Sequence, residues 1–135
     1  MYSKQVERQL HTPVYSGQRE PDFSLFAEAL AERDGRRAAS LDAWLPYASV
    51  ADLHRSLERG AVTCRELVLC CLRRIRQRVD LHAVGELNPD ALAIADQLDV
   101  EIRSRNWRGP LHGILVLLKD HIATSNRMHT TAESL

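Results

Sequence analysis

One short segment, residues 114–118, restricts the fold of this chain more than any other feature. It reads Ile-Leu-Val-Leu-Leu, without a polar residue, and it follows a turn-forming Gly109-Pro110 pair. A continuous apolar run of this length is typical of a strand that is covered on both faces of a sheet. We therefore expect residues 114–118 to form a buried strand, with Lys119 and Asp120 at its carboxyl end.

Two helix-start signals precede that segment. Ser49-Val-Ala-Asp52 and Thr63-Cys-Arg-Glu66 each place a hydroxyl side chain three residues before a carboxylate, which is the spacing of a capping box. The apolar residues after each box share one helix face, so we expect two helices that pack as a hairpin. Gly60 is expected to end the first of them.

The remaining elements alternate between helix and strand. Apolar spacing predicts a short helix over residues 22–33, capped by Asp22, and a longer one that starts at Asn88 and ends near residue 106. Residues 81–87 are a weaker candidate for a strand. This order predicts an α/β fold, in which N-terminal helices are followed by the first one or two strands of an incomplete mixed sheet.

The first part of the chain carries no recognisable motif. Residues 1–20 are polar and rich in turn-forming pairs, so they are interpreted as an arm. Gly35 is expected to end the short helix, and residues 41–47 resemble an apolar linker that packs on later elements. The predicted organisation is a polar arm with a short helix over residues 1–48 and a separate domain over residues 49–135.

Composition argues against several classes of partner. Eighteen basic and eighteen acidic side chains give a net charge of zero, which removes the positive field that nucleic-acid binding uses. No apolar stretch approaches the length of a membrane span and no secretory signal opens the sequence, so the expected location is the cytoplasm. The three cysteines, Cys64, Cys70 and Cys71, do not support a disulfide framework.

The histidines do not form a metal-binding pattern. His112, His121 and His129 are irregularly spaced and lack thiolates or carboxylates at ligand spacing. We therefore predict no metal and no other cofactor. His112 lies within a Gly-Pro-Leu-His-Gly turn, where it is interpreted as holding the loop by hydrogen bonding.

A longer stretch around the predicted strand carries the information on function. Residues 109–124 read Gly-Pro-Leu-His-Gly-Ile-Leu-Val-Leu-Leu-Lys-Asp-His-Ile-Ala-Thr. This stretch resembles the Gly-Pro-Leu-His-Gly-Ile-Pro-Val-Leu-Leu-Lys-Asp-Asn-Ile segment of amidase-signature enzymes. Residues 86–92, 95–99, 128–132 and 134–135 resemble flanking elements of that family. The likeness extends over about residues 49–135 and corresponds to the N-terminal portion of such an enzyme.

The resemblance implies a serine hydrolase that cleaves carboxamide C–N bonds. Its triad consists of a Ser, a second Ser joined by a cis peptide, and a Lys, whose place is taken here by Lys119. An amine acts as a base only when it is neutral, and burial by residues 114–118 is expected to favour the neutral form. The implied substrate is a small-molecule amide, and no substrate-binding residue is assigned.

Three positions differ from the family pattern. Leu115 stands where Pro is usual, His121 where Asn is usual, and Glu133 where Gly is usual. Leu115 restores an amide and is expected to cost little. Glu133 is expected to be costly if the family site requires a positive φ or close packing there.

The family's two serines and its oxyanion loop belong to a Gly- and Ser-rich stretch that comes later in its pattern, and these 135 residues contain no such stretch. Ser125 and Ser134 do not lie in a turn that would expose and activate a hydroxyl. The chain is therefore expected to be a truncated amidase segment that is inactive alone. The alternative is a non-catalytic interaction module or gene relic, which self-associates or binds an intact homologue through exposed strand edges.

Overall fold

The two capping boxes begin helices at the centre of the structure. A computed structural model describes residues 20–32 and 35–129 of the chain. Helix α4 (Val50–Glu58) starts at Ser49 and helix α5 (Cys64–Gln77) starts at Thr63, each with both hydrogen bonds of its box. Gly60, with a φ of +66°, lies in the turn between them. The prediction of two capped helices is confirmed.

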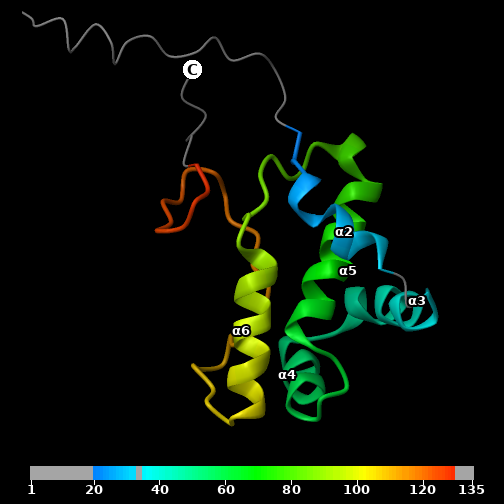
Figure 1. The fold of residues 1–135 in the computed structure, drawn as a ribbon, viewed down its shortest axis with the longest axis vertical. Coiled ribbons are helices and arrows are strands. Elements are labelled where there is room, and N and C mark those ends of the chain that lie inside the picture. The colour runs from blue at the N-terminus through cyan, green and yellow to red at the C-terminus, as the bar shows by residue number, and fades with distance from the viewer. Residues whose placement is uncertain (1–19, 33–34, 130–135) are drawn as a thin grey trace, which may run out of the picture.

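Helix α6 (Ala91–Arg103) packs beside α5 (Figure 1). It begins after Asp90, two residues later than predicted, because Asn88 Oδ1 accepts a hydrogen bond from the Asp90 amide at 3.0 Å and closes a turn before the helix. The core is made by buried apolar residues of several helices and the turn between α4 and α5: Phe26, Leu30, Leu57, Val62, Cys64, Leu67, Val68, Leu72 and Ala95.

Short helices at the N-terminal side contribute to this core. A 3₁₀ turn, η1 (Ser24–Phe26), leads into α2 (Ala27–Ala31), which packs against α5. Asp22 Oδ1 accepts a hydrogen bond from the Ser24 amide at 2.8 Å. A helix is present where one was predicted, but it is shorter, and the prediction that Asp22 caps it is wrong: Phe23 and Phe26 occupy the N-cap positions of η1 and α2, and neither end has a side-chain cap.

The segment that follows differs from its prediction. Gly35 begins a helix, α3 (Gly35–Trp44), which continues into a 3₁₀ turn, η2 (Leu45–Tyr47). The residues expected to form an apolar linker are therefore helical. Arg37 of α3 forms hydrogen bonds with the Glu66 carboxylate and, at 3.0 Å, with the Ala61 carbonyl oxygen. These contacts fasten α3 to the start of α5.

The predicted α/β fold is wrong, because the described residues form helices and no β-strand. The weaker candidate strand, residues 81–87, begins in a 3₁₀ turn, η3 (Val79–Leu81), and continues as coil. Residues 114–118 are also coil. A strand requires a neighbouring strand that takes up its backbone hydrogen bonds. Neither candidate segment has such a neighbour within the described ranges.

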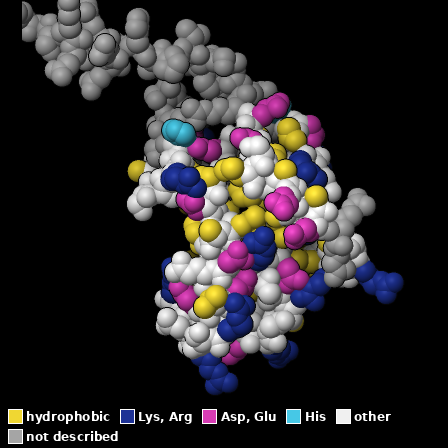
Figure 2. Space-filling model, viewed as in Figure 1, with side chains coloured by type: hydrophobic (Ala, Val, Ile, Leu, Met, Phe, Trp, Pro, Cys, Tyr) yellow, Lys and Arg dark blue, Asp and Glu magenta, His cyan; other side chains and the backbone are white. Residues whose placement is uncertain are grey.

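The face of the molecule drawn in Figure 2 shows no strong charge segregation. On the face drawn in Figure 2, acidic and basic side chains are interspersed, in keeping with the net charge of zero. Within residues 20–32 and 35–129, no helix has both the length and the apolar character needed to cross a membrane.

Candidate functional site

Lys119 lies in an exposed loop and not at the end of a buried strand. Its Nζ lies 3.7 Å from Asp120 Oδ1, and the two side chains are 59% and 41% exposed. The Ile122 amide donates a hydrogen bond to the Lys119 carbonyl oxygen at 2.9 Å, which closes a turn around the pair. The expected burial of the amine by the preceding residues is therefore wrong for the described chain.

The turn that precedes the apolar run is held by His112, whose side chain is buried. Its Nδ1 accepts a hydrogen bond from the Arg108 amide at 3.1 Å, and its Nε2 lies 3.2 Å from the Leu98 carbonyl oxygen of α6. Because a carbonyl oxygen only accepts, Nε2 carries the proton and the tautomer is fixed. The ring also contacts Trp107, with centroids 5.0 Å apart. The predicted loop-holding role of His112 is confirmed.

Gly113 packs the same turn against α4 and α5. Its φ is +75°, and a Cβ at this position would lie 2.7 Å from Cys64 Sγ and 3.0 Å from Leu57 Cδ1. A side chain would meet both an unfavourable backbone conformation and occupied space. Glycine is therefore required where the chain turns toward Lys119.

Asp99 of α6 joins α6 to the start of α5. Its buried carboxylate accepts hydrogen bonds from the Cys64 amide at 2.7 Å and the Arg65 amide at 3.2 Å. Amides in the first turn of a helix have no partner within that helix, and they favour a negative charge. Asp99 thus adds a second cap to α5, supplied by its neighbour helix.

The surroundings of the three cysteines favour the protonated thiol. Burial and, secondarily, the Asp99 carboxylate raise the pKa of the Cys64 thiol to about 12. Burial and a 2.7 Å hydrogen bond to Asp42 raise the pKa of Cys70 to about 12 as well. Burial also raises the pKa of Cys71. Since the thiolate is the nucleophilic form, these environments disfavour reaction at the three cysteines.

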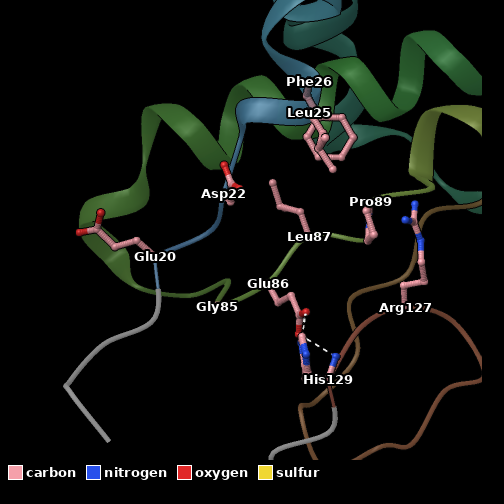
Figure 3. Close-up of a pocket in the computed structure, with 10 residues that line it drawn as sticks. All are labelled: Glu20, Asp22, Leu25, Phe26, Gly85, Glu86, Leu87, Pro89, Arg127 and His129. Carbon is pink, nitrogen blue, oxygen red and sulfur yellow. Dashed lines mark hydrogen bonds and ion pairs between the residues drawn. The ribbon is translucent and has the colours of Figure 1, made fainter.

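The chain beyond Lys119 returns to the start of α6. Arg127 pairs with Asp90 through Nε, at 2.9 Å, and through Nη2, and this pairing lowers the pKa of the Asp90 carboxyl. Glu86 accepts two hydrogen bonds from His129, one from its amide at 3.0 Å and one from Nδ1 at 2.8 Å (Figure 3). Two contacts therefore anchor the loop that contains Lys119 at its far end.

A surface hollow of about 370 Å³ lies beside the Glu86–His129 contact (Figure 3). It is lined by residues from the N-terminal side, the coil before α6 and the returning loop: Glu20, Asp22, Leu25, Phe26, Gly85, Glu86, Leu87, Pro89, Arg127 and His129. Lys119 does not line this hollow. The hollow and the predicted base therefore do not form one site.

The other predicted site residues are not brought into a catalytic arrangement. Ser125 and His121 are exposed in the loop after Lys119, and Glu133 and Ser134 lie outside the described residues. Over residues 20–32 and 35–129, no group of three or more His, Cys, Asp or Glu side chains could hold a metal ion.

Comparison with known proteins explains the pattern around Lys119. The sequence profile of the amidase family matches residues 66–135, slightly more than half of the chain. A putative amidase of Schizosaccharomyces pombe is 41% identical over 91 residues, which cover 67% of this chain and 16% of the relative. A probable amidase of Arabidopsis thaliana is 38% identical over 90 residues, covering 64% and 18%.

An amidase of Pseudomonas putida is 36% identical over 76 residues, which cover 56% of this chain and 16% of the relative. No solved structure matches the chain. The matched part is thus less than one fifth of the length of each of these relatives. The match of the family profile over more than half of its residues shows that this chain belongs to the amidase family.

Proposed function

We propose that this chain carries the lysine-bearing part of an amidase active site, with Lys119 as the base in hydrolysis of a carboxamide C–N bond. The observation that supports this proposal most is the stretch over residues 109–120, which lies within the family match. His112 and Gly113 hold the first turn of that stretch against α6, α4 and α5. A turn anchored in this way determines where the chain leaves toward Lys119, as a positioned base requires.

The proposed chemistry is that of the triad that the family resemblance implies. A serine oxygen attacks the amide carbon while a neutral lysine amine accepts the hydroxyl proton. The C–N bond then breaks as the departing nitrogen takes up a proton, and water releases the acyl group. Lys119 is 59% exposed here. The proposal therefore requires the remaining surfaces of an amidase domain to cover Lys119 and favour its neutral form.

A chimera tests the role of Lys119. Residues 66–135 would replace the corresponding segment of the Pseudomonas putida amidase, and ammonia release from a panel of simple amides would be measured. We expect the chimera to hydrolyse at least one amide, and Lys119→Ala and Lys119→Arg to abolish hydrolysis, because neither side chain offers a neutral amine. Arg103→Ala, at an exposed basic position on α6, is the matched control and should retain activity.

A serine-directed fluorophosphonate probe gives a second readout in the chimera, because labelling reports an activated serine even when no amide of the panel is a substrate. Labelling should require Lys119. A Lys119→Ala chimera that hydrolyses amides and reacts with the probe as fast as the unsubstituted chimera would contradict the proposal.

The 135-residue chain by itself is expected to show neither hydrolysis nor probe labelling, since Ser125 lies exposed in a loop without the turn that activates a nucleophile. Labelling of Ser125 or Ser134 that disappears in Lys119→Ala would show that the chain supplies its own nucleophile. That result would contradict the proposal that this chain supplies the lysine and another part of an amidase domain supplies the serine.

One observation favours a second function, that of a non-catalytic interaction module. Residues 115–118 of the apolar run before Lys119 are exposed, and the relative accessibility of Leu117 reaches 72%. Exposed apolar surface next to unpaired backbone commonly marks a binding surface.

A further inference from the structure

Helix α4 packs against the turn around His112 through two side chains of one face. His54 and Leu57 are separated by one helical turn, which places them on the same side of α4. Leu57 Cδ1 lies 3.0 Å from the position that a Cβ on Gly113 would occupy. The centroid of the His54 ring lies 4.9 Å from that of the Trp107 ring. The turn therefore meets α4 directly at Gly113 and indirectly through Trp107.

Trp107 contacts two histidine rings. Its centroid lies 4.9 Å from that of His54 and 5.0 Å from that of His112, and the interplanar angles are 47° and 56°. Tilted aromatic rings at this separation attract each other. Trp107 is partly buried against the core and His112 is buried. The ring cluster of His54, Trp107 and His112 thus connects α4 with the turn through internal contacts.

His54 contributes to the cluster by packing. Its Nε2 is buried and has no hydrogen-bond partner among residues 20–32 and 35–129. A buried polar atom without a partner lowers stability, so the contacts of this atom give no reason for an imidazole at this position. An apolar aromatic ring of similar shape should make the same contact with Trp107.

His112 passes the contact on to the chain that leads to Lys119. Its Nδ1 accepts a hydrogen bond from the Arg108 amide at 3.1 Å, and its Nε2 donates to the Leu98 carbonyl oxygen at 3.2 Å. Both bonds require one orientation of the ring, because the two nitrogens play opposite roles. The contact with Trp107 restricts rotation of that ring. The direction in which the chain leaves the turn toward Lys119 therefore depends on the ring cluster.

We propose that His54 and Trp107 are positioning residues for Lys119, acting through His112. This inference rests on the proposed function, because only a catalytic lysine has to be positioned for a reaction. His54 lies outside residues 66–135, the range that matches the family profile. The functional unit therefore includes a residue of α4 in addition to the matched range.

A longer chimera tests this role. Residues 49–135 would replace the corresponding segment of the Pseudomonas putida amidase, and kcat would be expressed per site labelled to completion by the fluorophosphonate probe, so that unfolded protein does not count. We expect His54→Ala and Trp107→Ala to lower kcat by at least ~10-fold with little change in KM, because a misplaced base slows the reaction without weakening substrate binding. Glu58→Ala, at an exposed position on α4, is the matched control and should leave kcat unchanged.

A conservative variant separates ring packing from imidazole chemistry. We expect His54→Phe to keep kcat within ~3-fold of the unsubstituted chimera, because a phenyl ring can make the same contact with Trp107. If His54→Phe is as slow as His54→Ala, the imidazole itself is needed and the positioning role is refuted. A rise in KM at constant kcat would also overturn it, since that result would indicate a role in substrate binding.

Nitrogen-15 NMR of the His112 ring in the 135-residue chain gives a readout without catalysis. The unsubstituted chain and His54→Phe should show one tautomer, with the proton on Nε2, whereas His54→Ala and Trp107→Ala should populate a second one. A single tautomer in His54→Ala would overturn the inference even if the chimera hydrolyses no amide.

The two proposals fail in different ways in the longer chimera. Hydrolysis that survives Lys119→Ala would contradict the proposed function. Hydrolysis that is lost in Lys119→Ala but keeps its kcat in His54→Ala would contradict the positioning role alone.

Discussion

Replacing Gly113 by alanine separates two energetic costs of the turn before Lys119. At a φ of +75°, an L-residue loses about 1–2 kcal/mol. The new Cβ would lie 2.7 Å from Cys64 Sγ and 3.0 Å from Leu57 Cδ1, and crowding of this kind costs about 1–3 kcal/mol. We expect Gly113→Ala to lower the free energy of unfolding by about 2–5 kcal/mol, a large share of a domain's total.

Two other glycines provide matched controls. Gly60 has a φ of +66°, and a Cβ there would have no neighbouring atom within 4 Å, so Gly60→Ala should show the backbone cost alone, about 1–2 kcal/mol. Gly35, at the start of α3, has neither a positive φ nor a neighbour within 4 Å. Gly35→Ala should be neutral or stabilising by up to about 1 kcal/mol. The entropy that alanine removes from the unfolded chain is common to all three variants.

Urea denaturation followed by far-ultraviolet circular dichroism and by tryptophan fluorescence would give the three free energies. Combining Gly113→Ala with Cys64→Ala should show favourable coupling, because the second change removes the sulfur that the methyl group meets. Equal destabilisation by Gly113→Ala and Gly60→Ala would refute the reasoning, since it would mean that the turn is not packed against α4 and α5.

Two further predictions concern α5. Asp99→Ala should lower the free energy of unfolding by about 3 kcal/mol, because it leaves the buried Cys64 amide and the part-buried Arg65 amide without their charged acceptor. Asp96→Ala, which breaks an exposed pair with Arg65, should cost under about 1 kcal/mol in the same urea titration. The pKa of Cys64 and of Cys70 rises from 9.0 to about 12 on folding. The unfolded chain then binds fewer protons than the folded chain above pH 9.0, so the free energy of unfolding should fall as the pH rises from there, and Cys70→Ala should make this fall less steep.

Features that depend on neighbouring residues in the chain were predictable from the sequence. The boxes at Ser49 and Thr63 start helices as expected because every atom of a capping box lies within four residues. The role of His112 followed from the tight turn that contains it. Asp99 escaped prediction because its hydrogen-bond partner Cys64 lies 35 residues away, and no local pattern indicates such a contact.

Helix α3 and the apolar run show where local patterns mislead. Helix α3 contains no buried residue and begins at Gly35, and glycine more often follows the end of a helix than starts one, so the local pattern predicted a helix end there. Ile94 belongs to the apolar stripe of α6 but is 42% exposed, since only part of that stripe meets α5. Residues 114–118 have the composition of a buried strand, but composition does not supply the strand that must pair with them.

The carboxylate of Asp99 has a consequence for the kinetics of amide hydrogen exchange. First-turn amides of an isolated helix exchange quickly with solvent deuterium, because nothing within the helix protects them. The amides of Cys64 and Arg65 are protected by α6 instead, so they exchange only when the two helices separate. Their exchange rates therefore measure how often α5 and α6 come apart, a motion that a label on either helix alone would not report.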